Sequence, residues 1–296
     1  MQAPEAETSP RAVRKILEVL YRTYNRREYV HPDPVEFLYA YDGLRDREIA
    51  AFVASALAYG RVAQVLKSVS FVLERMNPSP YIFLARTPHD RIHDAFRGFR
   101  HRFTTGGDLA GMLCGLKSVV RRHGSLGGCF LPGLSDDHET VLPALRDFAA
   151  ALARAPGCGY GSLLSSPEKG SALKRLNLFL RWMVRRDEVD PGGWDAVPRA
   201  KLIVPLDTHM HRISLALRLT ERRQADIRAA LEVTAGFRRF SPEDPVKYDF
   251  ALTRLGIHPG ADPETFLSCL KGKKIPRGAK NTPTTHSPRL LSRRAR

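Results

Sequence analysis

The chain has 296 residues, 43% of them hydrophobic, and a formal net charge of +16. This composition predicts a globular protein, and no apolar run reaches the about 18 residues of a transmembrane helix. Residues 1–15 lack the apolar stretch of a secretory signal, and the four scattered cysteines lack zinc or iron–sulfur spacing. We therefore expect a cytoplasmic protein with reduced thiols, without a metal or cofactor.

The positive charge is partly concentrated at the C-terminus. Residues 271–296 contain nine Lys and Arg residues and no acidic residue, which leaves +7 for residues 1–270. This segment is rich in Pro, Thr and Ser and has no hydrophobic periodicity, which predicts a disordered basic tail. The tail either increases solubility or binds a polyanion non-specifically. The +7 of residues 1–270 is the stronger indication of nucleic-acid binding, because it remains without the tail.

Hydrophobic residues recur at helical spacing along most of the chain. In chain order the predicted helices span residues 10–24, 46–59, 62–76, 109–120, 138–154, 171–185, 207–219, 223–239 and 243–255. The predicted loops span 98–107, 124–136, 156–170 and 186–206. There is no run of alternating strands, no internal repeat and no Gly-rich phosphate loop, so the sequence predicts an all-α fold.

Two of the predicted helices begin with residues that could carry chemistry. Asp207 follows an apolar run and precedes helical spacing, which predicts an N-cap whose carboxylate stays charged and fixed in direction. It is either a structural cap or a negative charge placed beside a developing cation. Lys174 and Arg175 lie in the first turn of the helix over 171–185, where two cations are unfavourable. They are either solvated surface residues, or their positive potential favours the neutral amine that a nucleophilic lysine needs.

The segment P-L-D-T-H-x-x-R, from Pro205 to Arg212, resembles the D-T-H-x-x-R segment of the helix-hairpin-helix base-excision DNA glycosylases such as endonuclease III. The 33-residue separation of Lys174 and Asp207 is similar to that in the archaeal 8-oxoguanine glycosylases. Residues 244–256 resemble the closing helix of those enzymes, and residues 50–60 the start of their first lobe. Over nearly its whole length the chain also resembles an uncharacterised bacterial family with the motifs K-R-L-N-x-F-L-R-W-M-V-R, P-L-D-T-H and D-P-V-K-Y-D-F-A-L.

The glycosylase resemblance implies a two-lobed helical architecture with a central cleft, built by residues 1–270 as two discontinuous lobes. It implies base excision from damaged double-stranded DNA, such as an oxidised purine, with Asp207 and Lys174 as catalytic residues and a Schiff base on the lysine. Because the chain has no long apolar run, we expect no association with a membrane, and we infer no obligate protein partner. The candidate DNA contacts are Lys169, Arg175, Trp194, His209, Arg212 and Lys247. The phosphate-gripping L-P-G-x-G hairpin of that superfamily is missing.

Aromatic residues could stack on an extruded base. The candidates are Tyr59, Phe99, Phe103, Trp182 and Trp194. We expect Phe99, Phe103 and Trp182 to lie in the core, as aromatic residues on helical faces usually do, and Trp194 in its loop to be the better candidate.

Two other functions remain open. The protein could bind nucleic acid on a glycosylase-like fold without catalysis, with Asp207 as a cap and Lys174 on the surface. Alternatively, D-T-H-M-H resembles the zinc-binding strand of the TIM-barrel amidohydrolases. That fold needs many strands after the motif, and His209 and His211 would point apart on a helix.

Overall fold

The computed structural model describes residues 9–154, 161–165 and 170–255. These residues form helices and one small antiparallel hairpin, so the all-α prediction is confirmed. Within these ranges no helix is long and apolar enough to cross a membrane. Lys169 and the predicted disordered tail over 271–296 lie outside the described residues.

The elements follow the predicted order, with several short additions. In chain order they are α1 (Pro10–Tyr24), the 3-10 helices η1 (Arg27–Tyr29) and η2 (Pro34–Ala40), α2 (Leu44–Ala56), α3 (Val62–Arg75), α4 (Pro80–Arg86), α5 (His89–Phe96), β1 (Arg100–His101), β2 (Thr104–Thr105), α6 (Gly106–His123), α7 (Leu126–Phe130), η3 (Leu131–Gly133), α8 (Leu142–Ala153), α9 (Lys174–Val184), η5 (Arg199–Lys201), α10 (Thr208–Ala216), α11 (Ile227–Arg238) and α12 (Asp249–Arg254).

The additions between predicted helices are η1, η2, α4 and α5, and those inside predicted loops are the β1–β2 hairpin, α7, η3 and η5. Each is too short to show several periods of hydrophobic spacing, which is the signal the sequence offers. The predicted helices over 171–185 and 243–255 begin later than expected, at Lys174 and Asp249.

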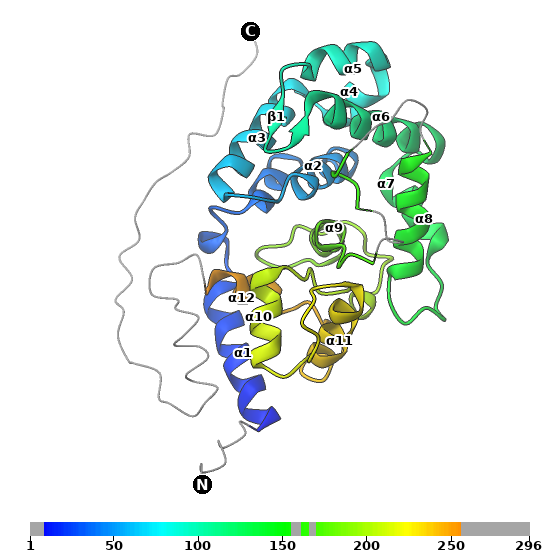
Figure 1. Cartoon of the computed structure of the whole chain (residues 1–296). Coiled ribbons are helices and arrows are strands. Elements are labelled where there is room, and N and C mark those ends of the chain that lie inside the picture. The colour runs from blue at the N-terminus through cyan, green and yellow to red at the C-terminus, as the bar shows by residue number, and fades with distance from the viewer. Residues whose placement is uncertain (1–8, 155–160, 166–169, 256–296) are drawn as a thin grey trace.

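Figure 1 shows the helices in two groups, with α9 between them. Helices α2 to α8 and the hairpin form the upper group, and α1, α10, α11 and α12 form the lower group. Helix α1 packs against α12, so the lower group combines both ends of the described chain. Helix α9 packs against α2, which places the first residue of α9 at the boundary between the groups.

The segment between α9 and α10 is packed against the protein along its length. Trp194 donates from its backbone N–H to the Met183 carbonyl at 2.8 Å and from Nε1 to Glu48 Oε1 at 2.7 Å. Its ring packs against Phe130 and Phe179 in the core. This fixed path returns the chain to the start of α9, where α10 begins.

A buried network of charges joins α9 to the following segment and to α12. Arg181 pairs with Asp190 at 3.1 Å and with Asp249, and Arg185 pairs with Asp190 and with Asp244, the last at 2.9 Å. All five side chains are buried or nearly so. Buried charges persist only when they are paired and hydrogen-bonded. The network therefore fixes α9 relative to α12.

Candidate functional site

The backbone before α9 sets the position of Lys174. Gly170 has φ +70°, and its carbonyl accepts from the Ile227 N–H at 3.1 Å, which ties it to the start of α11. Leu173 also lies in the left-handed region, with φ +52°, and is buried. That conformation costs a non-glycine residue about 1–2 kcal/mol. Such strain concentrates at functional sites, and here it lies one residue before Lys174.

Asp207 uses its two carboxylate oxygens differently. Oδ1 accepts from the Met210 N–H at 2.8 Å, so Asp207 is the predicted N-cap of α10. Oδ2 lies 3.3 Å from Nζ of Lys174. These two side chains, 33 residues apart in the chain, therefore meet in the structure. Their catalytic roles stay predictions.

This ion pair is open to solvent on one side. The side chains of Lys174 and Asp207 are 35% and 32% exposed. An ion pair that water reaches contributes little to folding, about 0–1 kcal/mol. Stability alone therefore gives little reason to hold Lys174 beside Asp207, whereas a ligand could reach both groups.

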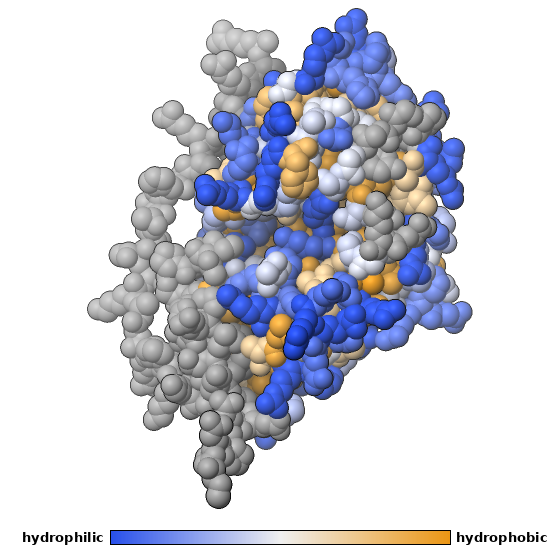
Figure 2. Space-filling model, in the orientation of Figure 1, coloured by the Kyte–Doolittle hydropathy of each residue, from blue (hydrophilic) through white to orange (hydrophobic). Residues whose placement is uncertain are grey.

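A hollow of about 350 Å³ adjoins Lys174. It is lined by the end of α2 and the start of α9, and the residues are Ala58, Tyr59, Gly60, Ser165, Ser171, Ala172, Leu173, Lys174 and Arg175. In the space-filling view, hydrophilic residues border a recess between the two groups of helices (Figure 2). Lys174 and the other residues of this hollow thus lie where the upper and lower groups meet.

Two of the predicted DNA contacts lie on α10, close in sequence to Asp207. Arg212 is exposed, and no carboxylate in the described part of the chain pairs with it. His209 is partly buried, and its Nε2 lies 3.4 Å from the Leu252 carbonyl, a long hydrogen bond. Arg212 is therefore available to a phosphate, and His209 helps to seat α10 against α12.

Three other predicted DNA contacts are bonded within the protein. Arg175 donates to the Ala56 carbonyl at 2.9 Å and to the Ser162 carbonyl, so it ties α9 to α2. Lys247 pairs with Glu18 of α1 at 2.7 Å. Trp194 is 4% exposed and lies in the core. The buried Trp194 ring has no face open to a base, which corrects its prediction as a stacking residue, whereas DNA contacts by Arg175 and Lys247 stay predictions.

Of the three aromatic residues expected in the core, two lie there and one does not. Phe99 and Trp182 are buried as expected, whereas Phe103 is 61% exposed at the turn of the β1–β2 hairpin. The sequence offered a signal for this, because the segment Arg100–Phe103 alternates basic and aromatic residues in a predicted loop. The sequence did not predict that Phe103 and its neighbour Arg102 lie near the hollow.

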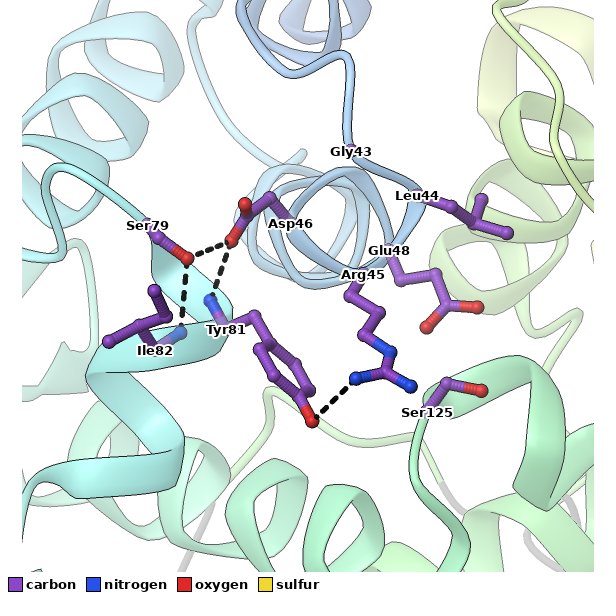
Figure 3. Close-up of a pocket in the computed structure, with 9 residues that line it drawn as sticks. All are labelled: Gly43, Leu44, Arg45, Asp46, Glu48, Ser79, Tyr81, Ile82 and Ser125. Atoms are coloured by element: carbon purple, nitrogen blue, oxygen red, sulfur yellow. Dashed lines mark hydrogen bonds between the residues drawn. The ribbon is translucent and has the colours of Figure 1, made fainter.

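A second hollow, of about 530 Å³, lies on the upper group and is less suited to chemistry. Its polar groups are bonded to one another, as Figure 3 shows. Asp46 accepts from Ser79 Oγ at 2.6 Å and from the Tyr81 N–H at 2.8 Å, and Arg45 donates to Tyr81 Oη at 3.1 Å. Glu48 accepts from Trp194 and from the backbone at the start of α7. These bonds hold α2, α4 and α7 together.

The D-T-H-M-H segment does not assemble a metal site. His209 faces the Leu252 carbonyl, while His211 is buried and its Nε2 donates to the Arg222 carbonyl at 2.8 Å. The two rings diverge, as expected for residues two apart on a helix. Across residues 9–154, 161–165 and 170–255, no three His, Cys, Asp or Glu side chains are grouped to hold a metal ion.

Comparison with known families gives one match. Residues 33–258 match the family described as "Protein of unknown function (DUF2400)", and the chain belongs to this family. Neither the curated proteins nor the solved structures give a match. The matched range contains the start of α9, the start of α10 and the hairpin.

Proposed function

We propose that this member of the DUF2400 family is a DNA glycosylase that removes a damaged base and then opens the sugar through Lys174. The observation that carries the proposal is the contact of Lys174 Nζ with Asp207 Oδ2 at 3.3 Å, partly exposed, beside a hollow. The D-T-H-x-x-R resemblance of the segment that holds Asp207 supports the same function.

Base removal places positive charge on the sugar. A base must first leave the duplex stack, which costs a few kcal/mol, and contacts from basic residues to phosphates offset that cost. When the bond between C1′ and the base nitrogen breaks, its electron pair leaves with the base, which takes up a proton. The carboxylate of Asp207 is held in place by the Met210 N–H, so it can stabilise the charge without reorganising.

Cleavage of the DNA strand requires Lys174 as a nucleophile. Its amine, after losing a proton, forms a bond from Nζ to C1′. The C1′–O4′ bond then breaks, its electron pair goes to O4′, and a Schiff base remains on Lys174. Loss of a proton from C2′ expels the 3′ phosphate with its electron pair. Asp207, in contact with Nζ, is placed to accept the lysine proton.

The rival function is a nucleic-acid binder without catalysis. The capping bond from Met210 to Asp207 favours it, because that bond gives the carboxylate a structural purpose of its own. The two functions differ in whether Lys174 becomes covalently attached to DNA.

Borohydride trapping distinguishes them. The full-length protein is incubated with duplexes that each carry one damaged base, together with sodium borohydride, which reduces a Schiff base to a stable adduct. We expect an adduct with at least one lesion, and its loss in Lys174→Ala. Lys67→Ala, at an exposed lysine of α3, is the matched control and should trap like the wild type. Equal trapping by wild type and Lys174→Ala would refute the nucleophile. No excision of any lesion would favour the binder.

A further inference from the structure

The tip of the β1–β2 hairpin presents an aromatic ring to solvent. Arg102 and Phe103 form the turn, with Arg102 at φ +54°. The Phe103 side chain is 61% exposed, more than any other large hydrophobic side chain in the described residues. An apolar ring that is held in solvent at a fixed place is available for contact with a partner outside the protein.

The ring is held by a rigid support. Phe103 stacks on Tyr59, with ring centroids 5.2 Å apart and planes 23° apart. The Tyr59 hydroxyl donates to the His101 carbonyl at 3.0 Å and contacts Thr104 Oγ1 at 2.6 Å. His101 Nε2 donates to the Tyr59 carbonyl at 3.0 Å. Both strands of the hairpin are therefore bound to Tyr59, and Phe103 needs no ordering when a ligand arrives.

The packing between the hairpin and the turn after α2 is close. Gly60 has φ +92°, and a Cβ at this position would lie 2.8 Å from Cδ of Arg102. Tyr59 and Gly60 also line the hollow that contains Lys174, and the Arg175 guanidinium lies 5.3 Å from the Tyr59 ring centroid. The aromatic pair thus stands at the edge of the same hollow as the candidate site.

The surroundings of the ring are basic. Arg61, Arg100 and Arg102 are exposed, and in the described ranges none of them pairs with a carboxylate. Arginines beside an exposed aromatic ring match single-stranded or unstacked nucleic acid, whose phosphates meet the cations while a base stacks on the ring. A partner protein at this place would need an acidic surface with an apolar pocket, whereas DNA supplies both chemistries in each nucleotide.

We infer that Phe103, supported by Tyr59, is a stacking platform for an unpaired nucleobase at the entrance to the Lys174–Asp207 site. This inference rests on the proposed function, because it names how that site holds a base that has left the duplex. Phe103 is a binding residue, since it touches the base and takes no part in bond breaking.

The test uses a duplex with one unpaired 2-aminopurine, whose fluorescence falls when the base stacks. The wild-type protein should quench it, and Phe103→Trp should keep the quenching. Phe103→Ala should lose the quenching and bind the duplex about 5- to 100-fold more weakly, the range for removal of one stacking partner. Ile82→Ala is the matched control, because Ile82 is an exposed apolar residue on α4 and is 44% exposed.

Three results of this experiment would test the stacking platform. If Phe103→Ala quenches and binds like the wild type while its circular dichroism is unchanged, the platform does not exist. If Phe103→Trp also loses quenching, stacking on an aromatic ring is refuted even where the alanine variant folds poorly. If quenching depends on Phe103 but no lesion is excised, the platform stands and the glycosylase proposal falls.

Discussion

The two carboxylate oxygens of Asp207 have different partners. Oδ1 caps α10 through Met210, and Oδ2 faces Lys174 at 3.3 Å. The cap fixes the carboxylate in direction, and partial exposure leaves Oδ2 accessible. Because the two oxygens have separate partners, a substitution can remove the charge while it keeps the cap.

Asp207→Asn makes that separation. The amide oxygen still accepts from the Met210 N–H, so the free energy of unfolding should fall by less than the about 1 kcal/mol lost with a cap. Loss of the charge should slow base excision by about 10²–10³-fold, as for other losses of preorganised electrostatic stabilisation. Single-turnover excision and urea denaturation measure the two effects. Asp207→Ala is the comparison that loses both. Excision by Asp207→Asn at the wild-type rate would leave Asp207 as a cap only.

The β1–β2 hairpin depends on a buried histidine. His101 is fully buried and contacts Ser68 Oγ at 2.9 Å as well as the Tyr59 carbonyl. Burial lowers the pKa of His101 below its usual 6.5, and the nearby Arg102 charge lowers it further, against the opposing effect of the Tyr59 carbonyl. The anchored hairpin therefore favours the neutral form of His101.

Acid should release this hairpin. The pKa of His101 is lower in the folded than in the unfolded protein, so the unfolded form binds the proton more readily. The stabilisation is present above about pH 6.5 and is lost as the pH falls through the folded-state pKa. Amide hydrogen exchange of residues 100–105, corrected for intrinsic rates, should speed up from pH 7 to pH 5, while α11 stays protected. In the control variant His101→Asn, the corrected exchange rate of these residues should not change with pH. A wild-type rate that is also independent of pH would contradict the prediction.

The relative position of the two groups of helices depends on the buried charge network around α9. Asp190 is fully buried and accepts from both Arg181 and Arg185. Burial alone would lower the pKa of Arg185, but the carboxylates of Asp190, Asp244 and Asp187 raise it far above its usual value. Removing the shared carboxylate would leave two buried guanidinium groups with fewer partners.

Asp190→Ala should therefore lower the free energy of unfolding by about 3–5 kcal/mol, the cost of breaking a buried pair. The matched control is Arg186→Ala. Arg186 lies 3.6 Å from Asp195 with both side chains mostly exposed, so this substitution should cost at most about 1 kcal/mol. Urea denaturation measures both. Similar losses for the two variants would show that the network adds no more stability than a surface pair.

The charge of the whole molecule predicts how its proposed binding to DNA should depend on salt. Of the net +16, residues 1–270 carry +7 and residues 271–296 carry +9. Each phosphate contact releases counterions, so affinity should fall steeply with salt. Deletion of 271–296 should flatten the plot of log affinity against log salt and leave a residual affinity in residues 1–270. Fluorescence anisotropy with duplex DNA measures this. Affinity that disappears with the tail would mean that the helical part has no DNA surface.

Arg175, Trp194 and Phe103 show where sequence reasoning reaches its limit. Each has a side chain suited to DNA, yet Arg175 and Trp194 are held by Ala56 and Glu48, more than 100 positions away in the sequence. Phe103 is exposed because it lies in the two-residue turn of the hairpin, where its ring stacks on Tyr59 instead of entering the core. Burial depends on such long-range neighbours, which a local pattern does not contain.

The sequence by itself determined the helical class, the long amphipathic helices and the cap at Asp207, because 3.6-residue periodicity and capping are properties of neighbouring residues. Only the tertiary structure decided that α9 begins at Lys174, that Lys174 reaches Asp207, and that Phe103 stacks on Tyr59, which lines the hollow next to Lys174. The physical reason is the path of the chain between α9 and α10, which is set by Trp194 against Glu48 and by the buried arginine–aspartate network, contacts that form only when distant segments pack together.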